Sequence, residues 1–156
     1  MRLTLHTDYA LRLLISLAVA DGERRTVEDL SRRHRVSTNH LMKVARSLIE
    51  AGFVAGVRGR NGGLELARPP ADICIGEVVR TCEESFALVD CFAPDTDRCL
   101  LVPACGLRAP LQEALAAFLG VLDRYSLADL VACPAQTKAL RRLVFPDAPQ
   151  AIGGGP

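Results

Sequence analysis

Tryptophan is absent from this chain of 156 residues, and the other aromatic side chains amount to two tyrosines and five phenylalanines. The hydrophobic core must therefore be built mainly from leucine, valine and alanine. The chain also lacks any apolar run near the roughly 20 residues that a membrane-spanning helix requires. It contains no Ser/His/Asp arrangement, phosphate-binding glycine loop or pair of carboxylates that would indicate catalysis. We therefore expect a soluble globular protein that is not an enzyme and has no membrane partner.

The start of the chain argues against a secretion signal. The apolar run 13–20 is short for the core of a signal peptide, and Asp8 and Arg12 interrupt the segment before it. We therefore expect a cytoplasmic protein, in which thiols stay reduced. Clustered cysteines in that compartment more often bind a metal or do redox chemistry than form disulfides.

Charge is divided unevenly along the chain, although the formal net charge is only +1. Residues 1–68 contain twelve lysines and arginines against seven acidic residues, whereas residues 69–156 contain seven against eleven. A basic first half and an acidic second half indicate that only the first half meets a polyanion such as nucleic acid.

Helix and strand signals in the first half follow one another in an informative order. They predict a helix over 7–20, a second helix capped by Thr26, and a third that begins at Ser37 and stops at a glycine. Two short alternating segments, 53–57 and 64–66, then flank RGRNGG, and Asn-Gly between such segments favours a hairpin. The order predicts a mainly α fold with a small β-hairpin wing, namely a winged helix-turn-helix domain over the basic first 68 residues.

The third helix and the hairpin tip supply the candidate DNA-binding residues. In a helix-turn-helix the second helix of the motif presents its first turns to base edges in the major groove. Asparagine can pair with adenine, lysine can reach guanine or phosphate, and arginines on a wing suit the minor groove. The alternative is that these side chains form an ordinary solvated surface. The candidates are Ser37, Thr38, Asn39, His40, Lys43, Arg46, Arg58, Arg60 and Asn61.

The second half begins after a Pro-Pro hinge. A short helix over IGEVVRTCEES precedes a cysteine-rich loop, and Pro110 then lies in the first turn of a long helix. Leucines and one phenylalanine form a continuous apolar seam along that helix, which is typical of a long dimerisation helix. We expect the cysteine loop and this helix to occupy residues 69–133, and residues 134–156 to form a partly disordered C-terminal tail.

Three of the six cysteines, Cys91, Cys99 and Cys105, form the pattern C-x7-C-x5-C. This spacing is not that of a zinc ribbon or a ferredoxin, but three thiolates in one loop can close around a soft metal centre if a fourth ligand comes from elsewhere. The alternative is that they are small apolar residues packed in a loop. The other cysteines, which we interpret as structural, are Cys74, Cys82 and Cys133.

Several segments resemble, in order, the NsrR/IscR family of winged-helix regulators. These segments are MRLTLHTDYALRLL, VSTNHLMKVARSLIEAGFV, VRGRNGG, ADICIGEVVR, CLLVPACGL and RYSLADLV. The resemblance runs over residues 1–132 and implies a homodimeric transcriptional repressor that binds palindromic double-stranded DNA.

The resemblance also implies an iron–sulfur cluster held by the three loop cysteines, with Asp8 of the opposite subunit as the fourth ligand. That ligand set favours a [4Fe–4S] over a [2Fe–2S] cluster, and nitric oxide would be its signal. Arg12, four residues after Asp8, would orient the carboxylate as a supporting partner. The residues alone favour the other interpretation of Asp8, an ordinary first-turn carboxylate paired with Arg12, and only the resemblance indicates a ligand. Arg108 stands where IscR-like members have a histidine ligand, which favours the nitric-oxide-sensing branch, although the Cys91–Cys99 interval is longer than that branch leads us to expect.

Two other functions stay open at this point. One is a regulator of the IscR type that senses iron–sulfur status or redox state. The other is a metal-binding protein whose cysteine site is structural, for example a zinc site, and whose winged helix contacts other proteins. Specific, salt-dependent binding to a DNA palindrome would exclude the second alternative.

Overall fold

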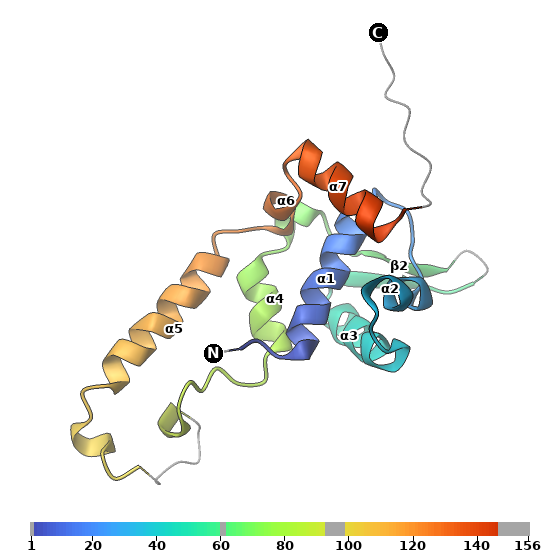
Figure 1. Ribbon diagram of the computed structural model, residues 1–156. Coiled ribbons are helices and arrows are strands. Elements are labelled where there is room, and N and C mark those ends of the chain that lie inside the picture. Colours follow the sequence, from blue (N-terminus) through green and yellow to red (C-terminus); the bar gives the residue numbers. More distant parts are fainter. Residues whose placement is uncertain (1, 60–61, 93–98, 147–156) are drawn as a thin grey trace.

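The first helix, α1 (Leu5–Val19), lies at the centre of the molecule (Figure 1). The structure, a computed structural model, describes residues 2–59, 62–92 and 99–146. Helix α1 begins earlier than the predicted range of 7–20 because Thr4 is its N-cap. The Thr4 hydroxyl accepts the backbone N–H of Thr7 at 3.3 Å, and the Thr7 side chain is buried inside the first turn.

Helices α2 (Val27–His34) and α3 (Thr38–Glu50) form the helix-turn-helix. As predicted, Thr26 caps α2, and its side chain accepts the N–H of Asp29 at 3.1 Å. Arg35 ends α2 in the left-handed conformation, with φ of 54°, and this reversal directs the chain into α3. The two helices therefore form as the local capping signals indicate.

The wing consists of strands β1 (Val54–Val57) and β2 (Gly63–Leu66), which pair antiparallel with Gly56 opposite Leu64. The predicted hairpin is confirmed. Arg25 extends this sheet at its base, because its N–H donates to the Leu64 carbonyl at 3.1 Å and its carbonyl accepts the Leu64 N–H at 2.8 Å. The connection between α1 and α2 thus holds the wing against the body.

Three helices complete the body: α4 (Ile75–Cys82), the short α6 (Leu127–Leu130) and α7 (Pro134–Val144). Each of them packs on α1. The sequence did not indicate helix α7, which occupies eleven residues of the tail predicted over 134–156, and Phe145 after it is buried. Residues of the tail beyond 146 lie outside the described part of the chain.

Long-range contacts explain why α7 is ordered. The Phe145 ring lies under the Arg25 guanidinium, with 3.9 Å between the guanidinium carbon and the ring centroid. Arg141 forms ion pairs with Asp21 at 3.7 Å and with Glu23 at 3.5 Å. All these partners lie between α1 and α2, more than 100 residues away in the sequence. No local pattern in the C-terminal segment could have indicated them.

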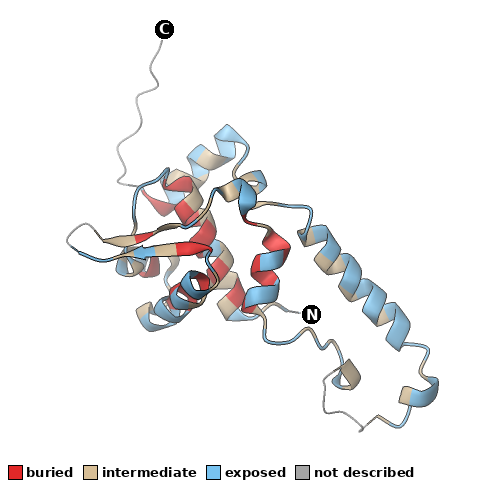
Figure 2. Cartoon of the chain, turned by 180° about the vertical axis from the view of Figure 1, so that it is seen from behind, coloured by how far each residue is buried: buried red, intermediate tan, exposed pale blue. Residues whose placement is uncertain are grey.

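The cysteine loop and helix α5 (Arg108–Leu122) extend away from the body (Figure 1). We call the described residues 83–92 and 99–122 the arm, and the rest of the described chain the body. The arm contains two short 3-10 turns, Asp90–Phe92 and Val102–Ala104, before α5. Buried residues concentrate in the body, whereas every described arm residue is at least partly exposed (Figure 2).

The expected fold class, mainly α with a small β-hairpin wing, is confirmed. None of the described helices is both long enough and apolar enough to cross a membrane. The boundaries proposed from the sequence for separate functional regions stay predictions.

Candidate DNA-binding surface and cysteine loop

Helix α3 has one face in the core and one face on the surface. Its buried face consists of Leu41, Val44, Ala45 and Leu48. The long polar candidates all lie on its exposed face, namely Asn39, His40, Lys43 and Arg46. Because the apolar face anchors the helix to α1 and α2, the polar face is held in a fixed orientation toward solvent. This arrangement suits insertion into the major groove.

The first two candidates on α3 differ in their surroundings. Ser37 is the N-cap residue and is exposed, but its side chain makes no capping hydrogen bond. Thr38 is half-buried, and its hydroxyl lies 2.9 Å from the hydroxyl of the buried Ser31 in α2. Thr38 therefore connects the two helices of the motif, whereas Ser37 is exposed and makes no such connection.

Arg46 is highly exposed, with 81% of its side chain accessible. It pairs with Glu50 one turn later at 2.8 Å, and the hydrogen bond to that carboxylate raises the pKa of Arg46. An exposed pair of this kind contributes little to stability. Arg46 can therefore exchange Glu50 for a phosphate at small cost.

The wing presents Arg58 on the surface, while Arg60 and Asn61 lie outside the described residues. Close packing at the wing base explains the second glycine of the Gly-Gly pair. A Cβ at Gly63 would lie 2.9 Å from the Arg25 carbonyl oxygen, so a side chain there would push the wing from the body.

A hydrogen bond between α1 and α2 involves residues to which the sequence assigned no role. His34 Nε2 lies 2.8 Å from the Ser16 hydroxyl, and that hydroxyl also donates to the Arg12 carbonyl at 2.8 Å. Burial of the imidazole, and secondly the nearby Arg12 charge, lower the pKa of His34. His34 is therefore a neutral structural link between the helix-turn-helix and the central helix. A separation of 18 residues hides such a pair from any local pattern.

Asp8 and Arg12 form the i,i+4 pair that the sequence indicates. Arg12 donates from Nε to Asp8 Oδ1 at 3.0 Å, and its terminal nitrogen lies 2.6 Å from Oδ2. The Asp8 side chain is 38% exposed, so a face of the carboxylate stays accessible. The pair is a bidentate contact on the surface of α1.

The cysteine loop lies at the far end of the arm, beyond the start of α5 (Figure 1). All six cysteines of the chain fall within the described residues and are free thiols, and Cys91, Cys99 and Cys105 are each partly exposed. Within the described part of a single chain, no three His, Cys, Asp or Glu side chains gather as a metal-binding group. The structure thus supplies three accessible thiols on one loop but does not bring Asp8 to them.

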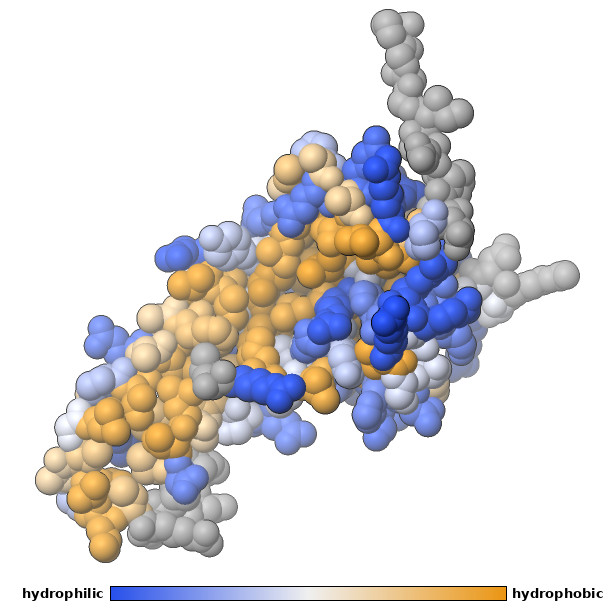
Figure 3. Space-filling view, in the orientation of Figure 1, coloured by the Kyte–Doolittle hydropathy of each residue, from blue (hydrophilic) through white to orange (hydrophobic). Residues whose placement is uncertain are grey.

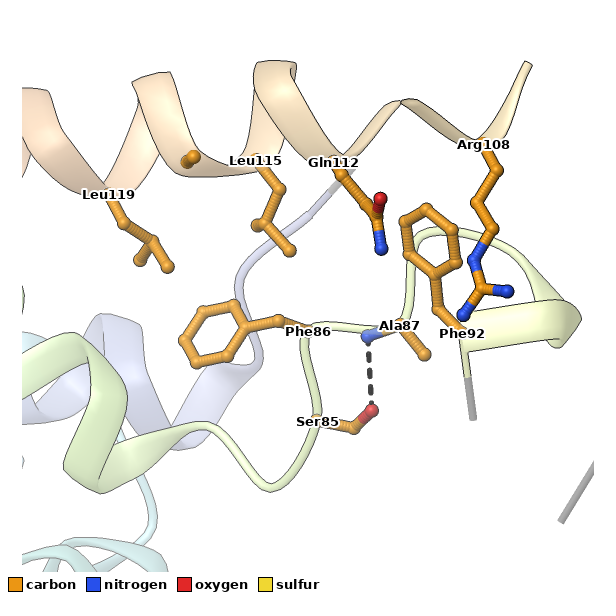
Figure 4. Close-up of a pocket in the computed structure, with 9 residues that line it drawn as sticks. Ser85, Phe86, Ala87, Phe92, Arg108, Gln112, Leu115 and Leu119 are labelled. Atoms are coloured by element: carbon orange, nitrogen blue, oxygen red, sulfur yellow. Dashed lines mark hydrogen bonds between the residues drawn. The ribbon is translucent and has the colours of Figure 1, made fainter. Parts of the chain in front are cut away.

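A cavity of about 460 Å³ separates α5 from the segment that follows α4 (Figure 4). Phe86 and Phe92 point toward it from that segment, Leu115 and Leu119 from α5, and Arg108 stands at one end. Apolar residues also dominate the visible surface of the arm, whereas hydrophilic residues gather over the side that carries α2 (Figure 3). The arm is therefore loosely packed and apolar.

The remaining cysteines have separate environments. Cys82 is buried at the end of α4, and burial raises its pKa to about 11, so the thiol stays protonated. Cys74 is half-buried, with its sulfur 3.7 Å from the Asp123 carbonyl oxygen. These positions agree with a structural role. Cys133 is exposed at the start of α7, which differs from the buried packing expected of a structural thiol.

Comparison with known proteins gives close relatives. The chain is 47% identical over 141 residues to the HTH-type transcriptional regulator NsrR of Geobacillus kaustophilus, an alignment that covers 90% of this chain and 96% of that protein. It is 48% identical over 132 residues to NsrR of Bacillus subtilis, covering 84% and 90% respectively. These relatives are named as transcriptional regulators, which confirms that the chain is a regulator and not an enzyme.

Solved structures give the same fold at lower identity. IscR of T. potens matches with a TM-score of 0.66 and 25% identity, over 87% of this chain and 91% of that one. CymR, the global cysteine regulator of B. subtilis, matches with a TM-score of 0.67 and 24% identity, over 85% and 97%. Residues 3–133 match the Rrf2 family, described as an iron-dependent transcriptional regulator. The chain therefore belongs to the Rrf2 family of winged-helix transcriptional regulators.

Proposed function

We propose that this regulator is a repressor whose binding to its operator depends on an iron–sulfur cluster and is relieved by nitric oxide. The observation that carries the proposal is the similarity to proteins named NsrR over nearly their whole length. The three free and accessible thiols on one loop support it.

The DNA contacts are assigned to the exposed polar face of α3 and to the wing. Asn39, His40 and Lys43 would meet base edges, and Ser37 and Arg46 the phosphates beside them. Arg58 would approach the minor groove together with the other wing residues proposed from the sequence. In a homodimer, two copies of α3 would lie about 34 Å apart, one turn of DNA, and would read the halves of a palindrome.

Homodimerisation is assigned to the apolar seam of α5. Its members are only partly covered within one chain, and they are Leu111, Leu115, Phe118, Leu119 and Leu122. The apolar area they leave in water is the kind that a second copy buries in a two-fold interface. The loose packing around the 460 Å³ cavity agrees with an arm that becomes compact only against a partner.

The cluster is assigned to Cys91, Cys99 and Cys105, with Asp8 of the second copy as the fourth ligand. Thiolates are the ligands that iron–sulfur clusters prefer, so the chemistry of this donor set fits the group. When bound, the cluster would supply iron with which nitric oxide can react. A carboxylate is a harder and weaker ligand for iron than a thiolate, and it would be the first to be lost.

Arg12 would orient the Asp8 carboxylate, because it holds both carboxylate oxygens in this structure. Helix α1, which carries Asp8, packs directly on α3. Attachment of Asp8 to the partner's loop would therefore fix the position of the recognition helix of one copy relative to the other. Release of Asp8 would remove that constraint and lower the affinity for the operator.

The test is anaerobic purification followed by visible spectroscopy and by iron and sulfide analysis, with nitric oxide added stepwise while operator affinity is measured. The proposal predicts about four iron and four sulfide per chain, a spectrum that bleaches with nitric oxide, and a parallel loss of DNA binding. A measured content of about two iron and two sulfide per chain would still indicate a cluster, but it would weaken the assignment of Asp8 as a ligand.

Asp8 variants sharpen the test. Asp8→Ala should uncouple DNA affinity from both cluster assembly and nitric oxide, whereas Asp8→Cys restores a ligand and should restore the coupling. If operator affinity changes with the redox state but does not change when nitric oxide is added, the protein is instead an IscR-type sensor. A colourless zinc-containing protein that still binds DNA would reduce the cysteine loop to a structural site.

A further inference from the structure

Met42 is a large apolar side chain on the exposed face of the recognition helix. It is 52% exposed, and it lies one turn after Asn39, one turn before Arg46 and next to Lys43. The other exposed apolar residue of α3 is accounted for, because Ile49 lies against the wing: its Cδ1 is 3.2 Å from where a Cβ on Gly56 would be.

The position of Met42 matters because of what the major groove offers. Base edges there carry hydrogen-bond donors and acceptors, and their one apolar group is the C5-methyl of thymine. A methionine side chain is unbranched and polarisable, so it adapts its shape to a small apolar partner. An apolar side chain among polar base-contacting residues can therefore distinguish thymine from the other bases without a hydrogen bond.

We propose that Met42 selects thymine in the operator by packing its thioether side chain against the C5-methyl group in the major groove. The inference rests on the DNA-binding function proposed above, and it adds a specificity-determining residue that the polar motif does not contain. Because Asn39 one turn earlier is suited to adenine, the two residues together favour A·T pairs at neighbouring positions of each half-site.

The surroundings of Met42 favour DNA over an apolar protein partner. Lys43 and Arg46 flank it, and residues 39–46 of α3 contain no acidic side chain. Arg58 on the wing is a further exposed cation. An apolar protein surface would leave these cations desolvated and unpaired, whereas a duplex neutralises them with phosphates.

The experiment first selects an operator from a random pool of duplexes with the full-length protein. Each thymine of the selected site is then replaced singly by uracil, which differs only in lacking the methyl group. Affinities are measured for the wild type, for Met42→Ala and for Met42→Leu, which keeps an apolar side chain. Thermal melting serves as the folding control, since truncating an exposed side chain should leave stability unchanged.

The expected result is one thymine per half-site at which uracil weakens wild-type binding about fourfold, the effect of one lost methyl contact. Met42→Ala should bind the thymine duplex more weakly by a similar factor and lose nothing further with uracil, whereas Met42→Leu should keep most of the discrimination. Equal uracil effects in wild type and Met42→Ala at every position would overturn the inference while leaving the DNA-binding function intact. Failure of the pool to yield any preferred sequence would overturn both.

Discussion

The body and the arm bury their apolar residues differently. In the body, Leu13 and Leu41 are almost completely enclosed within one chain. In the arm, Leu100 is 96% and Leu101 69% exposed, and no residue of the described arm is buried. The difference arises because α5 packs mainly on α4, whereas α1 packs on several helices and on the wing. The body therefore has its own core, whereas the described arm leaves its apolar residues at least partly exposed, and we propose that a second copy covers them.

The largest expected effect comes from opening the core of the body. Phe53 is 1% exposed and lies under the Arg68 guanidinium, 4.6 Å from the ring centroid. Phe53→Ala should lower the free energy of unfolding by about 3–5 kcal/mol, measured by urea titration, because it leaves a cavity. Leu115→Ala in the arm is the matched control and should cost far less at low protein concentration. Equal losses would show that the arm is as well packed as the body.

A charge on the seam of α5 tests the other half of the comparison. Leu119→Lys should weaken self-association by about 2 kcal/mol or more, because in the proposed α5 interface it replaces an apolar residue with a buried unpaired cation. Sedimentation analysis over a range of concentrations measures this change. The urea midpoint of the dissociated protein should not change. Self-association as strong as that of the wild type would show that α5 does not form the interface.

The cap of α2 offers a smaller change inside the body. Thr26→Ala removes the acceptor of the Asp29 N–H and should cost about 1 kcal/mol of unfolding free energy. Thr26→Ser keeps the acceptor and should behave like the wild type. A loss of unfolding free energy seen only at concentrations where the protein is associated would mean that a second copy stabilises α2. The body would then not be stable independently of association, contrary to the comparison with the arm.

The smallest expected effect is a pH dependence of the body. The pKa of His34 is lowered by burial, so below pH ~6.5 the unfolded chain binds a proton that the folded chain does not. Stability contributed by the neutral imidazole is therefore complete above that pH and falls as the solution becomes more acidic. His34→Gln should flatten the slope of unfolding free energy against pH between 5 and 7. An unchanged slope would show that titratable groups other than His34 cause the pH dependence of stability.

Local patterns were sufficient for much of the fold and for part of the candidate site. The cap at Thr26, the proline start of α5 and the Asp8–Arg12 pair each involve residues within one helical turn, so the chemistry that stabilises them is visible in the sequence. The exposed positions of Asn39 and Lys43 followed from helical periodicity. Met42 was missed because an apolar residue carries no polar signal, although the same periodicity places it on the surface.

The unpredicted features depend on residues that are distant along the chain. Thr38 bonds Ser31 across the helix-turn-helix, and Ser16 bonds His34 between α1 and α2. The order of α7 rests on Arg25 and on Phe145, which are far apart in the sequence. No spacing rule brings such residues together, since their distance is set by how whole helices pack.

The sequence by itself determined the helices of the DNA-binding motif, the hairpin, the three-thiol loop and the apolar seam of α5, because caps, periodicity and turn residues act over a few positions. Only the tertiary structure decided that α7 is part of the body, that Thr38 and His34 link helices, and that the arm leaves its apolar residues uncovered. These outcomes depend on burial, and burial is a property of the packed chain. A leucine in α1 and a leucine in α5 carry the same local signal, but only the first is enclosed by the rest of the chain.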